Sequence, residues 1–106
     1  MIVVTTEAVA GYRTVRTIGQ VFGVVVRSRD IGGNLMASLR SIFGGEIHEY
    51  TQMLEETRRH ALDRLVKNAT AMGANAVLMM RFDSTEIAQT MSEIVAYSTA
   101  AVIEPL

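Results

Sequence analysis

The chain has 106 residues, of which 49% are hydrophobic and 20% are charged, and its formal net charge is −1. This length predicts a single domain over residues 1–106, and the near-neutral charge excludes a strong bulk attraction to nucleic acid or to an anionic membrane. Because the chain has no cysteine, disulfides and thiolate metal sites are excluded as well. Its apolar runs fall short of the ~20 residues that a membrane helix needs, so we expect a cytoplasmic protein without a membrane or nucleic-acid partner.

The N-terminal part of the chain is rich in β-branched residues and predicts strands. Residues 2–6 form a short β-branched segment, residues 12–18 alternate less cleanly, and residues 20–29 are a strongly β-prone run. Gly19 and Gly23 mark bends or bulges where the second and third of these strands meet.

The middle of the chain predicts two helices. A short helix is expected over residues 35–43, and a long one over residues 46–72, with Gly73 as the residue that ends it. Several apolar positions of the long helix share one face, which we expect to pack on the core: Tyr50, Leu54, Ala61, Leu65 and Met72.

The C-terminal part returns to strands. Residues 74–82 predict one strand, residues 84–89 a turn, and residues 91–104 a last strand. Since the strands cluster at the two ends of the sequence, the fold class is α+β: a small mixed or antiparallel sheet with one short and one long helix.

The last strand is unusual because, from Ile94 to Ile103, neither of its two rows of side chains carries a charge. An antiparallel strand with one face in water normally shows polar residues on that face. Two helices can cover one face of the sheet, so another copy of the chain is the expected cover for the second face. A small closed barrel is the alternative. The two rows are Ile94, Ala96, Ser98, Ala100 and Val102, and Val95, Tyr97, Thr99, Ala101 and Ile103.

Six short motifs also occur in a characteristic order. They are "TT" (Thr5, Thr6), the "GVVV" strand, "IFGG" (residues 42–45), Tyr50, "ALDRL" (residues 61–65) and "MGANAV" (residues 72–77). In this order, and over nearly the whole chain from Thr5 to Ile103, they resemble the YbjQ-like family. These are small bacterial proteins that often carry the label heavy-metal-binding.

The resemblance implies an α+β fold that assembles into a ring, with the pentamer as the expected size and the chain itself as the partner. It also implies a divalent or heavy-metal ion as the ligand to test. Two regions depart from the family pattern. Ser98-Thr99-Ala100-Ala101-Val102 stands where relatives tend to have Ser-Gly-Thr-Ala-Val, and the preceding turn, which usually contains glycine, reads "EIAQTMSE" (residues 86–93).

The stretch "HEYTQ" begins like a zinc-hydrolase motif but ends in Gln52 instead of a second histidine. The other histidine, His60, lies twelve residues further along the predicted helix, which is about 18 Å at 1.5 Å per residue. His48 and Glu49 therefore need ligands from elsewhere to hold a metal. The alternative is a plain helix start, in which acidic residues are favoured by the helix dipole.

Glu56 and His60 are one helical turn apart and form the second candidate pair. Two ligands without cysteine make a weak metal site, and a Glu–His contact on the helix surface is the alternative. Met79 and Met80 are adjacent in a strand, so they should point to opposite faces and cannot chelate one metal together.

The sequence shows no acid–base–nucleophile set, so we expect a protein that is not an enzyme. Two hypotheses for its function remain. One is a homo-oligomeric domain that binds a metal ion or small ligand at subunit junctions, and the other is a purely structural or protein-interaction ring.

Overall fold

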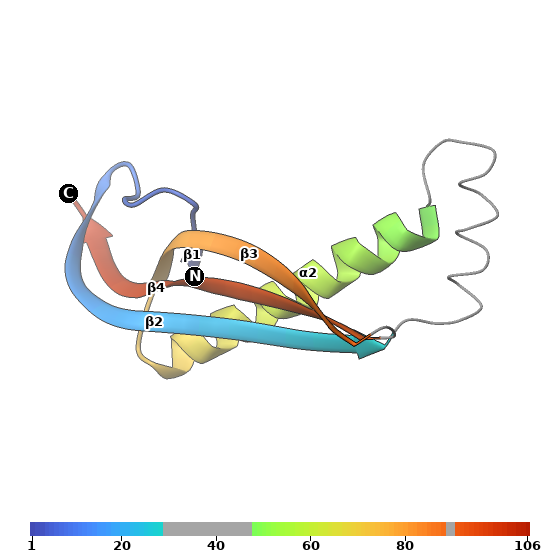
Figure 1. Cartoon of the computed structure of the whole chain (residues 1–106). Helices are drawn as coiled ribbons and strands as arrows, with labels where there is room; N and C mark the ends of the chain where they lie inside the picture. Colours follow the sequence, from blue (N-terminus) through green and yellow to red (C-terminus); the bar gives the residue numbers. More distant parts are fainter. Residues whose placement is uncertain (29–47, 89–90) are drawn as a thin grey trace.

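The structure is a computed structural model that describes residues 1–28, 48–88 and 91–106. In these ranges four strands form one mixed sheet in the order β1-β3-β4-β2, with β1 parallel to β3 and the other pairs antiparallel. One helix packs against this sheet (Figure 1). The α+β prediction is confirmed, and the short helix predicted over residues 35–43 lies outside the described residues. In chain order the elements are β1 (Ile2–Val3), β2 (Tyr12–Ser28), α2 (His48–Ala71), β3 (Ala76–Ala88) and β4 (Met91–Pro105).

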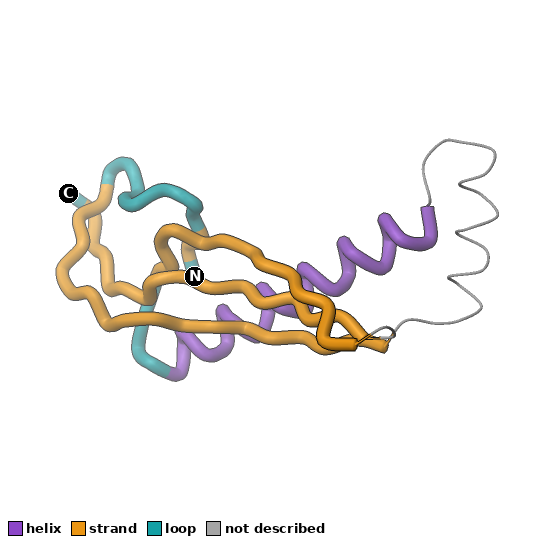
Figure 2. The backbone as a smooth tube through the Cα atoms, viewed as in Figure 1, coloured by secondary structure: helices purple, strands orange, loops and turns teal. Residues whose placement is uncertain are grey.

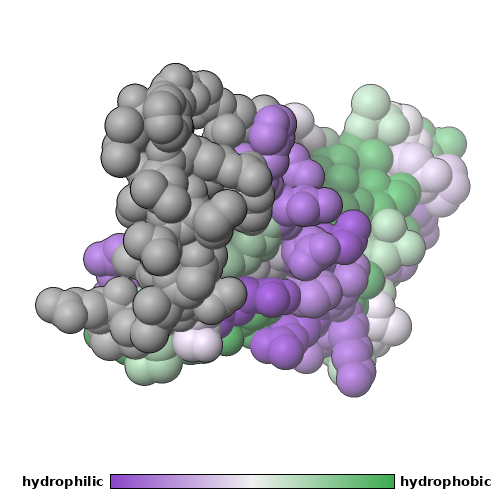
Figure 3. Space-filling model, turned by 90° about the vertical axis from the view of Figure 1, so that its right-hand side faces the viewer, coloured by the Kyte–Doolittle hydropathy of each residue, from purple (hydrophilic) through white to green (hydrophobic). Residues whose placement is uncertain are grey.

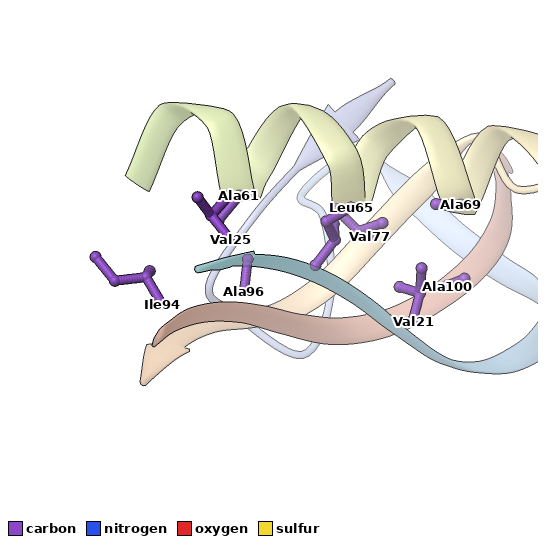
Figure 4. Packing of buried hydrophobic residues seen from close by; sticks show 9 residues of the cluster. All are labelled: Val21, Val25, Ala61, Leu65, Ala69, Val77, Ile94, Ala96 and Ala100. Atoms are coloured by element: carbon purple, nitrogen blue, oxygen red, sulfur yellow. The ribbon is translucent and has the colours of Figure 1, made fainter. Parts of the chain in front are cut away.

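The main core lies between α2 and one face of the sheet, where the side chains of the two layers point toward each other (Figure 4). Ala61 and Leu65 are fully buried, as the helical periodicity predicts. Leu54 and Met72 are wrongly predicted to be in the core, since they are 44% and 38% exposed. The first turns of α2 lie away from the strands (Figure 2), and Met72 follows the last helical residue. The Tyr50 side chain lies outside the described part of the chain.

The end of α2 is a Schellman motif built on Gly73. Ala74 N–H donates to the Ala69 carbonyl (3.1 Å) and Gly73 N–H donates to the Thr70 carbonyl (3.0 Å). Gly73 has φ of +89°, the left-handed conformation that favours glycine. The prediction that Gly73 ends the helix is therefore confirmed. Asn75 then fixes the chain to β4, because its amide donates to the Ile103 carbonyl and accepts from the Ile103 N–H, both at 2.8 Å.

The two strands predicted over residues 12–18 and 20–29 are one continuous strand, β2. The expected bulge at Gly19 is present as a register shift between Thr17 and Gly19. Gly23 does not bend the strand. It is buried where α2 packs, and a Cβ at this position would overlap the Ala61 carbonyl oxygen.

The turn predicted over residues 84–89 is wrong for residues 84–88, which belong to β3. Ser84 and Glu86 pair in register with Ile94 and Ser92 of β4. This pairing outweighs the modest β propensity of these residues, because strand formation depends more on cross-strand neighbours than on intrinsic preference. Residues 89–90 lie outside the described residues.

A bulge at Met79 interrupts β3, and no sequence signal predicted it. Met79 has φ of +55°, and the register with β4 shifts between Leu78 and Arg81. The N–H groups of Met79 and Met80 donate instead to the carbonyls of Thr6 and Val4, both at 3.0 Å. The strict alternation expected for the two methionines is therefore broken by a segment that docks from the N-terminus.

Candidate functional site

The four candidate metal ligands lie along α2 and are not brought together. His48 begins α2 and His60 lies twelve residues further on in the same continuous helix, so about 18 Å separates them. Glu56 and His60 are exposed and one turn apart, and the Glu49 side chain lies outside the described residues. Within residues 1–28, 48–88 and 91–106, no three His, Asp or Glu side chains gather in a metal-binding arrangement.

His60 contacts β2 through Arg27, whose Nη2 lies 2.7 Å from His60 Nδ1. A guanidinium can only donate hydrogen bonds, so Nδ1 is the acceptor, and in the neutral ring Nε2 carries the proton. Nδ1 is therefore occupied, and a metal on this ring would lie near a permanent cation. The described residues of one chain do not fit a heavy-metal site. Sequence reasoning missed the contact because the two residues are 33 positions apart.

The face of the sheet opposite α2 carries an exposed apolar patch on β2 and β4. We call it the uncovered face. Phe22 pairs in register with Tyr97, and Val24 with Val95. Their neighbours Val21 and Val25 are buried against α2, and successive side chains alternate between faces. Phe22, Val24, Val26 and Tyr97 are 49%, 41%, 51% and 39% exposed. The uncovered face consists of Phe22, Val24, Val26, Val95 and Tyr97.

The other end of this same face is covered by the chain's own N-terminal segment. Ala101 and Ile103 lie in the same row of β4 as Tyr97, yet they are 0% and 5% exposed. Ile2, Val4 and Val9 pack against them and against β3 in a second core cluster. Arg81 Nη1 also donates to the Thr5 carbonyl (2.8 Å). Within one subunit, the N-terminal segment therefore covers this row of β4 at Ala101 and Ile103 and leaves it exposed at Tyr97.

Side chains of α2 cap the outer edge of β2. Arg64 Nη1 donates to the Val24 carbonyl (2.5 Å) and Asn68 Nδ2 donates to the Phe22 carbonyl (2.8 Å). Because β2 is the outer strand of the described sheet and these carbonyls accept from α2, we assign them to the free edge of the sheet. An unpaired edge is a template for pairing with another strand, and here two of its acceptors are occupied. The uncovered face is therefore more accessible to a partner than this part of the edge.

Most of the exposed side chains of α2 are polar. Seen from the end of the molecule where α2 begins, hydrophilic side chains form a band across the surface (Figure 3). In the described part of the chain, α2 is not apolar enough to cross a membrane.

Comparison with known proteins adds a family and a fold. A family described as "Putative heavy-metal-binding", YbjQ_1, matches residues 1–104. A UPF0145 protein of Bradyrhizobium sp. (strain ORS 278) is 84% identical over 105 residues, which cover 99% of this chain and 95% of that protein. A UPF0145 protein of Methanocella arvoryzae is 54% identical over 105 residues, which cover 99% of this chain and 88% of that protein. The relatives include archaeal proteins, so the family is not limited to bacteria.

A solved structure resembles nearly the whole chain. It is a protein of unknown function, assigned to the DUF74 family, from Pediococcus pentosaceus ATCC 25745. The TM-score is 0.69 at 14% sequence identity, and the match covers 98% of each chain. At this identity the likeness shows the fold alone.

Proposed function

The chain belongs to the YbjQ family, and from this premise we propose that it is a non-enzymatic domain that assembles with copies of itself through the uncovered face. The observation that carries the proposal is the exposure of four large apolar side chains side by side on β2 and β4. Contiguous apolar patches on small proteins mark interaction surfaces. The names of the relatives assign no reaction to them.

A second copy is the occupant that we favour for this surface, because every copy of the chain carries the same apolar patch. The formal net charge of −1 also leaves little electrostatic repulsion between copies.

The core of one subunit is thin, which gives assembly a thermodynamic role. Six of the thirteen buried hydrophobic residues among those described are alanines, and Leu65 and Val77 are the largest that are fully buried. Alanine contributes little apolar area, and hydrophobic stabilisation scales with that area at roughly 25 cal/mol per Å². Burying the uncovered face against a neighbour would add the area that the isolated subunit lacks.

A ring, with the pentamer expected from the family resemblance, requires two different surfaces on each subunit, because a surface that contacts itself yields a dimer. The uncovered face would then contact another part of the neighbouring subunit. An ion or small ligand at subunit junctions would need donors from several copies, since the described donors of one chain do not converge. A purely structural ring is the alternative.

Sedimentation velocity at micromolar concentration tests the assembly. Val24→Lys places a charge in the middle of the uncovered face and should convert the oligomer to a monomer. Met72→Lys is the matched control, because Met72 is similarly exposed (38% against 41%) but lies at the end of α2. It should sediment like the unmodified protein. A monomeric unmodified chain, or a Val24→Lys variant that still assembles, would contradict the proposal.

A further inference from the structure

A cavity lies between the first half of α2 and the far ends of β2 and β4, on the helix side of the sheet. It measures about 40 Å³, and its walls are mostly apolar. Two more open hollows of about 240 and 270 Å³ share Leu54 and Ile94 with it. Together the three form one groove along the sheet, which we call the α2 groove. The cavity is lined by Arg27, Ser28, Met53, Leu54, Thr57, Ser92 and Ile94.

Among the described residues that line the cavity, Arg27 is the only charged one, and its guanidinium is only partly satisfied. Its Nη2 is held by His60 Nδ1 at 2.7 Å. Its Nε is buried and has no hydrogen-bond partner in the described structure. Buried donors are nearly always paired in native proteins, and an unpaired one is unfavourable. The contact with His60 fixes the guanidinium and leaves the Nε–H as an unused donor of a residue in the cavity wall.

The geometry of a guanidinium favours a carboxylate, because the planar fork can donate two parallel hydrogen bonds to its two oxygens. The side chains of Met53, Leu54 and Ile94 would surround the apolar part of such a ligand. The hydroxyl of Thr57 already donates to the Met53 carbonyl (2.7 Å), so it does not compete with Arg27 as a donor to the ligand.

The charges of the adjoining hollows restrict the ligand further. Arg58 lies over the Phe82 ring, 5.9 Å from its centroid, and lines one hollow together with Asp83. Glu86 lines the other hollow. Among the described lining residues, the two carboxylates balance the charges of Arg27 and Arg58, so no excess positive charge attracts a second negative charge on the ligand. A monoanion with an apolar body is therefore favoured over phosphate or a dicarboxylate.

We infer that the α2 groove binds a small organic monocarboxylate, with Arg27 as its anchor. The groove lies on the opposite side of the sheet from the uncovered face and uses residues of a single subunit. The inference therefore does not depend on self-assembly, and it names a ligand class that the family description does not.

Nuclear magnetic resonance of the ¹⁵N-labelled full chain tests the inference, with butyrate as the probe. The Arg27 Nε–H signal, assigned by its loss in Arg27→Lys, should shift saturably as butyrate is added. 1-Butanol, which lacks the carboxylate, and inorganic phosphate should each bind at least tenfold more weakly. No saturable shift, or equal binding of butanol or phosphate, would overturn the inference.

Variants separate the groove from general effects on the fold. Arg27→Lys keeps the positive charge but loses the planar guanidinium, so it should weaken butyrate binding at least tenfold. Backbone amide signals measure binding in this variant. Arg59→Lys changes an exposed arginine of α2 that does not line the groove, and it should leave the affinity unchanged. Ser92→Leu fills the cavity while keeping Arg27, so it should abolish the shift. Unchanged butyrate binding in both Arg27→Lys and Ser92→Leu would exclude the groove as the site.

Discussion

Gly23 is the residue on which the packing of α2 against β2 depends most directly. A Cβ at this position would overlap the Ala61 carbonyl oxygen and lie 2.5 Å from the Leu65 amide nitrogen. Both atoms belong to the helix backbone, so no change of side-chain rotamer can relieve the overlap. The helix as a whole would have to move away from the sheet.

Gly23→Ala should therefore lower the free energy of unfolding by about 1–3 kcal/mol or more, the range for overpacked cores. Gly11→Ala is the control, because Gly11 has φ of +81° and open space around the added methyl group. Its free energy of unfolding should fall only by the cost of placing alanine in a left-handed conformation, roughly 1 kcal/mol. Urea unfolding of both variants measures the difference, and a Gly23→Ala variant no less stable than Gly11→Ala would contradict this account.

Gly73 and Gly23 show what the sequence predicts at the scale of single residues. Gly73 was predictable because a helix end has a local signature: an apolar periodic segment followed by glycine. Gly23 was misread as a bend, because the reason for its presence is a helix that packs across it from about 40 positions further along the chain. The Arg27–His60 contact was missed for the same reason.

At the scale of elements, α2 protects the free edge of β2 as well as filling the core. Arg64 and Asn68 occupy the outward carbonyls of Val24 and Phe22. These carbonyls lie in the most apolar stretch of the strand, where unwanted strand pairing would be most favourable.

Removing both caps with Arg64→Ala and Asn68→Ala should cost about 0.5–1.5 kcal/mol per hydrogen bond and increase the rate of aggregation at elevated temperature. Lys67→Ala, an exposed residue on the same helix, should have neither effect. Urea unfolding gives the first quantity, and light scattering during heating gives the second. If the double variant aggregates no faster than Lys67→Ala, the edge is protected by something other than these two side chains.

The predicted strand boundaries agree with the structure for β4 but not for β3. The last strand, predicted over residues 91–104, is present as β4 (Met91–Pro105). A turn is predicted over residues 84–89, yet pairing with β4 keeps residues 84–88 in β3. The Met79 bulge had no sequence signal, because it depends on hydrogen bonds from the N-terminal segment.

For the whole molecule, the uncharged rows of β4 predicted that both faces of the sheet would be covered. They could not show that Ile2, Val4 and Val9 cover one half of the second face. That placement depends on β1 pairing with β3 across more than 70 positions of the chain. What remains uncovered is a smaller and better-defined surface than the sequence alone suggested.

If that surface is buried by assembly, folding and association are linked, and thermal stability must depend on protein concentration. For a pentamer that dissociates on unfolding, a tenfold dilution lowers stability by four fifths of the ~1.4 kcal/mol that corresponds to a factor of ten, or about 1 kcal/mol per chain. For a domain of this size, that shifts the melting temperature by about 4–8 °C. Scanning calorimetry at two concentrations should show this shift in the unmodified chain and in Met72→Lys, but not in Val24→Lys. A melting temperature that is independent of concentration in the unmodified chain would mean that the subunit is stable with its apolar face in water, and the link between thin core and assembly would be lost.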